Sequence, residues 1–292
     1  MHNSERGIDH IVLAVKDLEV AQERFSTLGF TCTPRAVHPF GTGNRLLQFA
    51  NSFVEIVTVV EPENLVPMSD THFSFGAQTV EFLKTGEGMN MMVMSSDDVR
   101  ADNAGWAARG LKTYDAVDFS RHAGQPDGSK ALVSFSTAFV VDPLMPAIAF
   151  FICQQHTPEN FWKPMYQNHE NGATNIVGIT ISAPQPERHR GFFEAYLPEG
   201  RIEESPGRLT IEAPRGRIEV LRPEGFDNRL GPDEARATGD QAAFSAITLS
   251  VTDLEALGEL FTERQIDHRH LGSRILLPAH DCFGLAFEFI AA

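Results

Sequence analysis

Three side chains that can bind a metal ion or move a proton, those of His10, His38 and Glu55, lie within one short stretch of this 292-residue chain. Glu55 stands between Val54 and Ile56, inside an apolar run that is typical of a buried strand. A buried carboxylate is unfavourable unless it meets a metal ion, another cation or a protonated imidazole. We therefore look for the chemistry of this chain around Glu55.

The elements that must position these side chains can be read from the order of the residues. Residues 8–15 form a continuous apolar run, which predicts a strand buried on both faces. Asp17 then suits the N-cap of an amphipathic helix, and Gly29 suits its left-handed end. Turn residues follow at Gly41 and Gly43. Three further strands are predicted, at 31–34, 45–49 and 53–60.

The same order recurs three times in weaker form, which predicts four βαβββ units and an α+β fold. We place these units at residues 7–60, 88–155, 174–222 and 243–291. The chain is long enough for two domains of about 150 residues. The predicted boundary lies near Gly172, giving domains 1–172 and 173–292. Residues 61–88 carry phenylalanines and are interpreted as a lid, and residues 223–241 as a polar loop.

Composition restricts the class of protein. Hydrophobic residues make up 42% of the chain and charged residues 22%, as in globular proteins. A net charge of −15 disfavours nucleic-acid partners, and no run approaches the roughly 20 apolar residues that span a membrane. The N-terminus has no apolar signal core, and three widely spaced cysteines are typical of reduced thiols. We expect a cytoplasmic protein without a nucleic-acid or membrane partner.

Three segments together resemble the glyoxalase-like branch of the vicinal oxygen chelate superfamily: GIDHIVLAVKDLEVAQERFSTLGF from residue 7, HPFGTGNRLLQF from residue 38 and FVEIVTVV from residue 53. The similarity continues more loosely through PDG at 126–128 and through 150–173. The resemblance implies paired units that form half-barrels around a small-molecule pocket, commonly with a divalent metal. The superfamily includes lactoylglutathione lyases, extradiol dioxygenases and metal-free drug-sequestering proteins, so the fold does not fix the function.

The resemblance also implies site residues. His10 matches the ligand position on the first strand of the unit, and Glu55 matches the one on its last strand. This pair suits Zn²⁺, Fe²⁺, Mn²⁺ or Ni²⁺. The superfamily takes its other ligands from the partner unit, where Met91 and Phe150 or Phe151 stand and cannot serve. His38 completes the predicted metal set if it faces the cavity, and otherwise it caps the turn that follows it.

Further residues are predicted to contact a substrate. Thr42, Asn44 and Arg45 follow the turn, and the Arg45 fork can bind a carbonyl or carboxylate group. The other candidates would line the pocket with aromatic and imidazole side chains: Phe135, Phe151, Trp162 and His169. For Trp162 and His169 the alternative is a hinge between the domains that is packed by aromatic rings.

Three functions stay open. The first is a metal-assisted lyase, isomerase or dioxygenase-type enzyme in which Glu55 and His38 take part in catalysis. The second is a metal-free binding protein with a phenylalanine-lined cavity. The third is a structural or regulatory homodimer with a vestigial pocket. Glu219 and Glu288 occupy strand positions like that of Glu55, but their first-strand counterparts are apolar, so they are interpreted as solvent-facing carboxylates in a structural domain.

Overall fold

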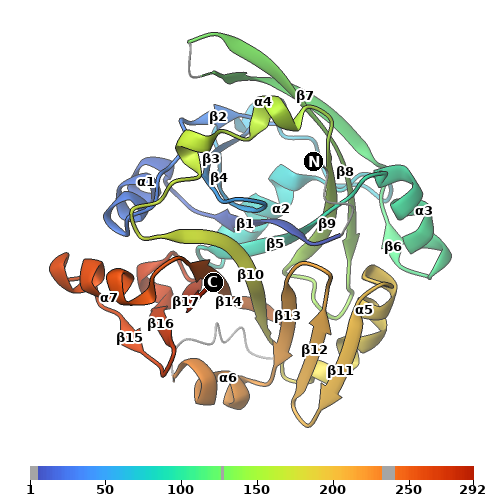
Figure 1. The fold of residues 1–292 in the computed structure, drawn as a ribbon. Coiled ribbons are helices and arrows are strands. Elements are labelled where there is room, and N and C mark those ends of the chain that lie inside the picture. Colours follow the sequence, from blue (N-terminus) through green and yellow to red (C-terminus); the bar gives the residue numbers. More distant parts are fainter. Residues whose placement is uncertain (1–5, 126–127, 232–240) are drawn as a thin grey trace.

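Two curled β-sheets, one after the other in the chain, dominate the computed structural model, which describes residues 6–125, 128–231 and 241–292 (Figure 1). The predicted α+β fold of two half-barrels is therefore confirmed. Pro126 and Asp127 of the PDG segment lie outside the described residues, as do residues 232–240 of the predicted loop. Among the described residues, no helix is long and apolar enough to cross a membrane.

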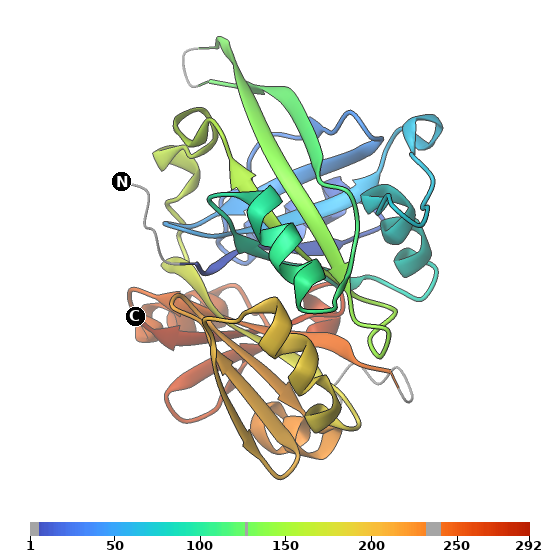
Figure 2. The same ribbon diagram turned by 90° about the vertical axis from the view of Figure 1, so that its right-hand side faces the viewer.

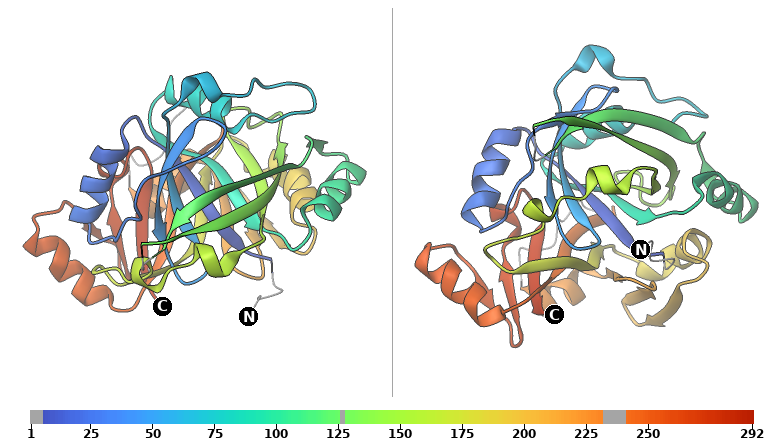
Figure 3. Two further views of the ribbon diagram at one scale, coloured as in Figure 1. Left: turned by 90° about the horizontal axis from the view of Figure 1, so that it is seen from above. Right: turned by 45° about the horizontal axis from the view of Figure 1, so that its top comes forward.

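The first half-barrel has the strand order β2-β3-β4-β1-β5-β9-β8-β6, and β7 pairs with β8. Its strands are β1 (Ile8–Ala14), β2 (Ala36–Val37), β3 (Thr42–Gln48), β4 (Phe53–Val59), β5 (Gly88–Ser95), β6 (Lys112–Thr113), β7 (Val117–Gly124), β8 (Lys130–Val141) and β9 (Ala149–Gln155). The predicted strand at 31–34 is wrong, and the predicted turn at Gly43 lies inside β3. These strands form a strongly curved sheet, and the β7–β8 hairpin is part of its curl (Figure 3).

The second half-barrel has the strand order β11-β12-β13-β10-β14-β17-β16-β15. Its strands are β10 (Ala173–Ser182), β11 (Arg201–Ser205), β12 (Arg208–Glu212), β13 (Arg217–Leu221), β14 (Ala243–Val251), β15 (Arg269–His270), β16 (Arg274–Leu277) and β17 (Ala286–Ala291). The chain thus passes from the first sheet to the second between Gln155 and Ala173. The division into domains at residue 172 stays a prediction.

Helices flank both sheets. They are α1 (Leu18–Thr27), α2 (Phe75–Leu83), α3 (Val99–Ala108), α4 (Pro158–Phe161), α5 (Arg190–Tyr196), α6 (Pro223–Leu230) and α7 (Leu254–Glu263), with short 3₁₀ turns η1 (Pro62–Asn64), η2 (Pro164–Tyr166), η3 (Pro186–His189) and η4 (Ala279–Asp281). Asp17 caps α1 as predicted, and its carboxylate accepts hydrogen bonds from the backbone N–H groups of Glu19 and Val20. The apolar stripe of Leu18, Ala21 and Phe25 is buried.

The two half-barrels are joined by buried aromatic residues. Trp106 of α3 stacks on Tyr196 of α5 with ring centroids 5.3 Å apart, and its indole N–H donates to the Tyr196 carbonyl. The Tyr196 hydroxyl donates to the carbonyl of Phe151 in the first sheet. Figure 2 shows α3 and α5 on the same flank, one from each half-barrel. Specific polar contacts inside an apolar interface therefore fix the position of the first half-barrel relative to the second.

Candidate functional site

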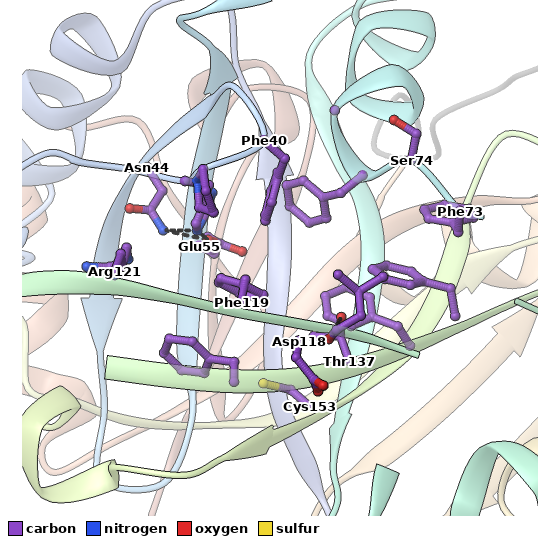
Figure 4. Close-up of a pocket in the computed structure, with 18 of the residues that line it drawn as sticks. Phe40, Asn44, Glu55, Phe73, Ser74, Asp118, Phe119, Arg121, Thr137 and Cys153 are labelled. Atoms are coloured by element: carbon purple, nitrogen blue, oxygen red, sulfur yellow. Dashed lines mark hydrogen bonds and ion pairs between the residues drawn. The ribbon is translucent and has the colours of Figure 1, made fainter. Parts of the chain in front are cut away.

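A cavity of about 240 Å³ lies inside the curl of the first sheet (Figure 4). Nine phenylalanines line it: Phe40, Phe53, Phe73, Phe75, Phe119, Phe135, Phe139, Phe151 and Phe161. Asn44, Glu55 and Arg121 lie together on one side, while Phe73 and Ser74 lie on the other. The segment interpreted as a lid contributes Phe73 to Gly76 to the lining, including the start of α2. The cavity thus combines an apolar wall with one polar end.

Glu55 is at the centre of the polar end. It lies on β4, is 6% exposed and pairs in register with Val12 of β1. One carboxylate oxygen, Oε1, accepts a hydrogen bond of 2.5 Å from the Asn44 amide. The other, Oε2, lies 3.8 Å from His10 Nε2 and has no hydrogen-bond partner among the described residues. Glu55 therefore has one oxygen that is held in place and one that is available to a ligand.

His38 is buried beside Glu55 and is neutral at pH 7. Burial lowers the pKa of His38 from 6.5 to about 4; the Glu55 carboxylate opposes this shift, whereas Arg121 and His10 add to it. Its Nδ1 lies 2.8 Å from Thr42 Oγ1, and its Nε2 lies 3.3 Å from the Asn44 amide nitrogen. A neutral ring protonated at Nδ1 satisfies both contacts, because it donates to Thr42 and accepts from Asn44.

The depressed pKa of His38 makes stability depend on pH. The unfolded chain binds a proton at this residue near pH 6.5, whereas the folded chain does so only near pH 4. The free energy of unfolding should therefore fall as the pH drops from 7 to 4, by on the order of 3 kcal/mol from His38 alone. Urea unfolding at several pH values should show a shallower fall in His38→Gln. Parallel pH profiles of the two proteins would contradict the assignment.

His10 reaches the cavity from β1 and is fixed by its neighbours. Its ring stacks on Phe53 with centroids 4.2 Å apart and meets the edge of Phe151. Asp9 is an extra residue in the pairing of β1 with β5, a β-bulge. Its carboxylate lies 3.5 Å from His10 Nδ1 and accepts two hydrogen bonds from the Gln155 amide. Nδ1 therefore faces Asp9, and Nε2 faces Glu55.

Two charged residues of this site were missed by the sequence reasoning. Asp9 is 3% exposed, and its position as the one acidic residue in the apolar run 8–15 is the signal that the sequence offers. Arg121 lies on β7, a strand that is absent from the predicted elements. Side-chain exposure alternates along this strand from Val117 to Gly124. Its Nε atom is buried without a hydrogen-bond partner among the described residues. Burial lowers the pKa of Arg121, and the nearby Glu55 carboxylate offsets only part of this.

The three residues that follow the turn and are predicted to contact a substrate, Thr42, Asn44 and Arg45, have side chains in three different places. Asn44 lines the cavity. Thr42 is buried behind it and holds His38 instead. Arg45 points elsewhere: its Nη2 donates to both carboxylate oxygens of Glu19 of α1, and its Nη1 donates to the carbonyl of Thr33. Arg45 therefore does not line the cavity, because alternation along β3 turns neighbouring side chains to opposite faces.

Of the four aromatic and imidazole residues predicted to line the pocket, two line the cavity and two do not. Phe135 and Phe151 face the cavity, and Trp162 and His169 do not line it. Trp162 packs against Phe161, with ring centroids 5.2 Å apart. His169 accepts a hydrogen bond from the backbone N–H of Thr31 and lies 2.8 Å from the Gln48 carbonyl. These two residues connect the linking segment to the first sheet, as in the hinge interpretation.

The three predicted metal ligands are close to one another without surrounding one point. Glu55 Oε1 lies 3.4 Å from His38 Nε2, and Glu55 Oε2 lies 3.8 Å from His10 Nε2. Among the described residues, however, the only His, Cys, Asp or Glu side chains that place three possible ligand atoms within 4.8 Å of one another are those of Asp267, His280 and Asp281, outside this cavity. Two ligand atoms at about 2.1 Å from one ion lie at most about 4.2 Å apart. With one ligand atom taken from each of His10, His38 and Glu55, at least one pair exceeds this limit. The side chains as arranged do not fit a single metal ion.

The second half-barrel has its own buried carboxylates, so the prediction that Glu219 and Glu288 face solvent is wrong. They are 4% and 1% exposed. Arg229 of α6 bonds to both, while Arg208 also bonds to Glu219 and Arg274 to Glu288. Residues 223–230, predicted as loop, form this helix, and its apolar side chains fill the interior: Phe226 and Leu230 pack with Leu221, Ala246, Leu276 and Ala286.

Comparison with known proteins agrees with this architecture. A family model described as a glyoxalase-like domain matches residues 8–197, about two thirds of the chain. A hypothetical protein from Staphylococcus aureus has a similar structure, with a TM-score of 0.71 and 11% identity over 98% of this chain and 100% of its own. No curated protein matches the sequence.

Two further structures share the fold. A variant of 4-hydroxymandelate synthase from Streptomyces coelicolor has a TM-score of 0.58 and 11% identity over 98% of this chain and 92% of its own. A fusion of a xylose isomerase-like TIM barrel with 4-hydroxyphenylpyruvate dioxygenase has a TM-score of 0.57 and 12% identity over 98% of this chain and 49% of its own. The chain belongs to the glyoxalase-like domain family, within the vicinal oxygen chelate superfamily.

Proposed function

We propose that the chain is a glyoxalase-like enzyme that binds a small oxygenated substrate in the first half-barrel and moves a proton on it. The observation that carries this proposal is that the two carboxylate oxygens of Glu55 have different surroundings. Asn44 holds Oε1, and Oε2 faces the cavity without a hydrogen-bond partner among the described residues. A carboxylate presented in this way suits a general base.

The surrounding residues support proton transfer between neighbouring atoms of a substrate. Glu55 Oε2 would accept a proton from a carbon next to a carbonyl group. His10 Nε2 lies 3.8 Å from that oxygen and would exchange a proton with the substrate oxygen. Asn44 would keep the carboxylate in place. The phenylalanine wall excludes water, which strengthens electrostatic interactions inside the cavity.

Divalent metals are common in this superfamily. When bound, such an ion polarises a carbonyl group and stabilises the negative charge that forms on it. His10, His38 and Glu55 do not converge on one point in this chain, and Asn44 and Thr42 already engage Glu55 and His38. The proposed proton transfer therefore depends on the side chains alone.

Hydrogen exchange into a panel of small carbonyl compounds tests this proposal. The full chain is incubated in D₂O with small aldehydes, ketones and 2-oxo acids, and loss of the proton next to the carbonyl is followed by NMR. We expect exchange above the buffer rate for at least one compound, and the rate should persist after dialysis against a chelator. Exchange that stops with the chelator would contradict the metal-free mechanism.

A second candidate is a small-molecule binding protein without chemistry. The observation that favours it is the predominance of phenylalanine in the cavity wall, because such a wall gives affinity rather than catalysis. Compounds that raise the melting temperature but undergo no exchange in D₂O would favour binding over catalysis.

A further inference from the structure

We propose that the ligand of the first half-barrel is an aromatic acid with a single ring, and that Arg121 binds its carboxylate. This inference rests on the proposed function only in that it takes the cavity to be a ligand site. It holds whether the protein transforms the compound or only binds it. Two features of the cavity lead to this inference: its size, and the lack of a partner for the Arg121 guanidinium among the described residues.

The size and lining of the cavity indicate one aromatic ring. A buried apolar cavity of about 150 Å³ holds benzene. The cavity here, at about 240 Å³, therefore has room for one ring with a short side chain. Phe135 and Phe119 stack with centroids 5.2 Å apart, and Phe139 and Phe151 lie 4.5 Å apart, so rings of the cavity wall already pack against one another. Offset or edge contacts with these rings favour an aromatic ligand over an aliphatic one.

Arg121 indicates the charge of the ligand. Its guanidinium forms no ion pair or hydrogen bond with the described residues, and its Nε is buried. The two acidic residues at the cavity have hydrogen-bond or ion-pair partners other than Arg121. Asp118 pairs with Arg100 and accepts from the Ser136 hydroxyl, and Glu55 accepts from Asn44. A half-buried cation without a partner is unfavourable, and a ligand carboxylate would supply the missing partner.

The electrostatic surroundings limit where such an anion can bind. The Glu55 carboxylate repels it. Within the described part of the chain the ion pairs of Glu55 are with His10 and His38 and not with Arg121, so the Arg121 guanidinium is available to the ligand. The ligand carboxylate is therefore expected at Arg121, with the ring among the phenylalanines and the carbon next to the carboxylate or carbonyl turned toward Glu55.

Calorimetric titration of the full chain tests the inference with matched pairs of probes. The pairs are benzoate, phenylacetate and 3-phenylpropionate, each with its neutral amide. The wild type should bind at least one acid roughly 10- to 100-fold more tightly than its amide. Arg121→Gln should lose this preference with little change for the amide, and Arg121→Lys should retain part of it. Arg45→Gln serves as the control, because Arg45 lies outside the cavity and pairs with Glu19.

The possible results separate the two proposals. Equal affinity for acids and amides, or an unchanged preference in Arg121→Gln, would overturn the inference about Arg121 and leave the proposed function standing. Loss of preference in Arg45→Gln as well would attribute it to general surface charge and would also overturn the inference. Failure of every acid and every amide to bind the wild type would count against the cavity as a ligand site, and so against both proposals.

Discussion

Replacement of Glu55 by glutamine should lower the rate of substrate hydrogen exchange by roughly 10²- to 10⁴-fold, the range typical of a lost general base. Glutamine has nearly the same shape, and its carbonyl oxygen can still accept the hydrogen bond from Asn44. It cannot take a proton at neutral pH. The rate should therefore fall while the affinity for a neutral ligand changes little, and NMR in D₂O together with calorimetry would measure both quantities.

Two further variants make this result specific. Glu55→Asp keeps a carboxylate but shortens its reach by one methylene, so it should retain more activity than Glu55→Gln. Glu203→Gln removes a carboxylate from an exposed pair in the second half-barrel and should leave the rate unchanged. Wild-type exchange in Glu55→Gln would contradict the role of Glu55 as base, and equal losses in all variants would point to a general effect of charge.

The elements of the fold could be predicted where local signals are strong. Asp17 caps α1 as the sequence predicts, and the apolar run before it is β1. Asp253 caps α7 after β14 in the same way. Capping depends on a residue and its own helical turn, so it can be read from one short segment. Pairing of strands across the sheet follows from the repeated βαβββ order, which the sequence also displays.

The candidate site was predicted less completely, because long-range geometry decides it. The bulge at Asp9 depends on how β1 pairs with β5, a strand some 80 residues away in the chain. The position of Arg121 depends on the hairpin of β7 and β8. The guanidinium group alone suggests Arg45 as a substrate contact. The direction of its side chain, however, follows from its place in β3, where it forms an ion pair with Glu19 of α1. The chemistry of a residue type does not by itself indicate which face it occupies.

Strand register explains why the carboxylates of the four units differ in role. Glu55 pairs with Val12, Phe151 with Val93, Glu219 with Thr180 and Glu288 with Thr248. Three of the four equivalent positions thus carry a carboxylate. In the first half-barrel that carboxylate faces a cavity, whereas in the second α6 fills the interior and supplies a cation. The same strand position therefore supports a ligand site in one half-barrel and a packing contact in the other.

Replacement of Arg229 by methionine should destabilise the protein by roughly 3–5 kcal/mol, the range for breaking a buried ion pair. Arg229 bonds to both Glu219 and Glu288, which are almost completely buried. Burial by itself raises the pKa of Glu288, but Arg229, Thr248 and Arg274 outweigh it and hold the pKa below its ordinary value. Without Arg229 the two carboxylates keep their burial and lose the cation between them. Urea unfolding at pH 7 measures the loss.

A matched set of variants distinguishes loss of this ion pair from loss of packing. Arg201→Met removes an exposed pair with Glu203 and should change stability by less than about 1 kcal/mol. Adding Glu219→Gln to Arg229→Met removes one of the two buried carboxylates that have lost Arg229, so it should restore part of the stability. A double variant less stable than the single one would contradict this explanation, because it would mean that Arg208 alone still compensates Glu219.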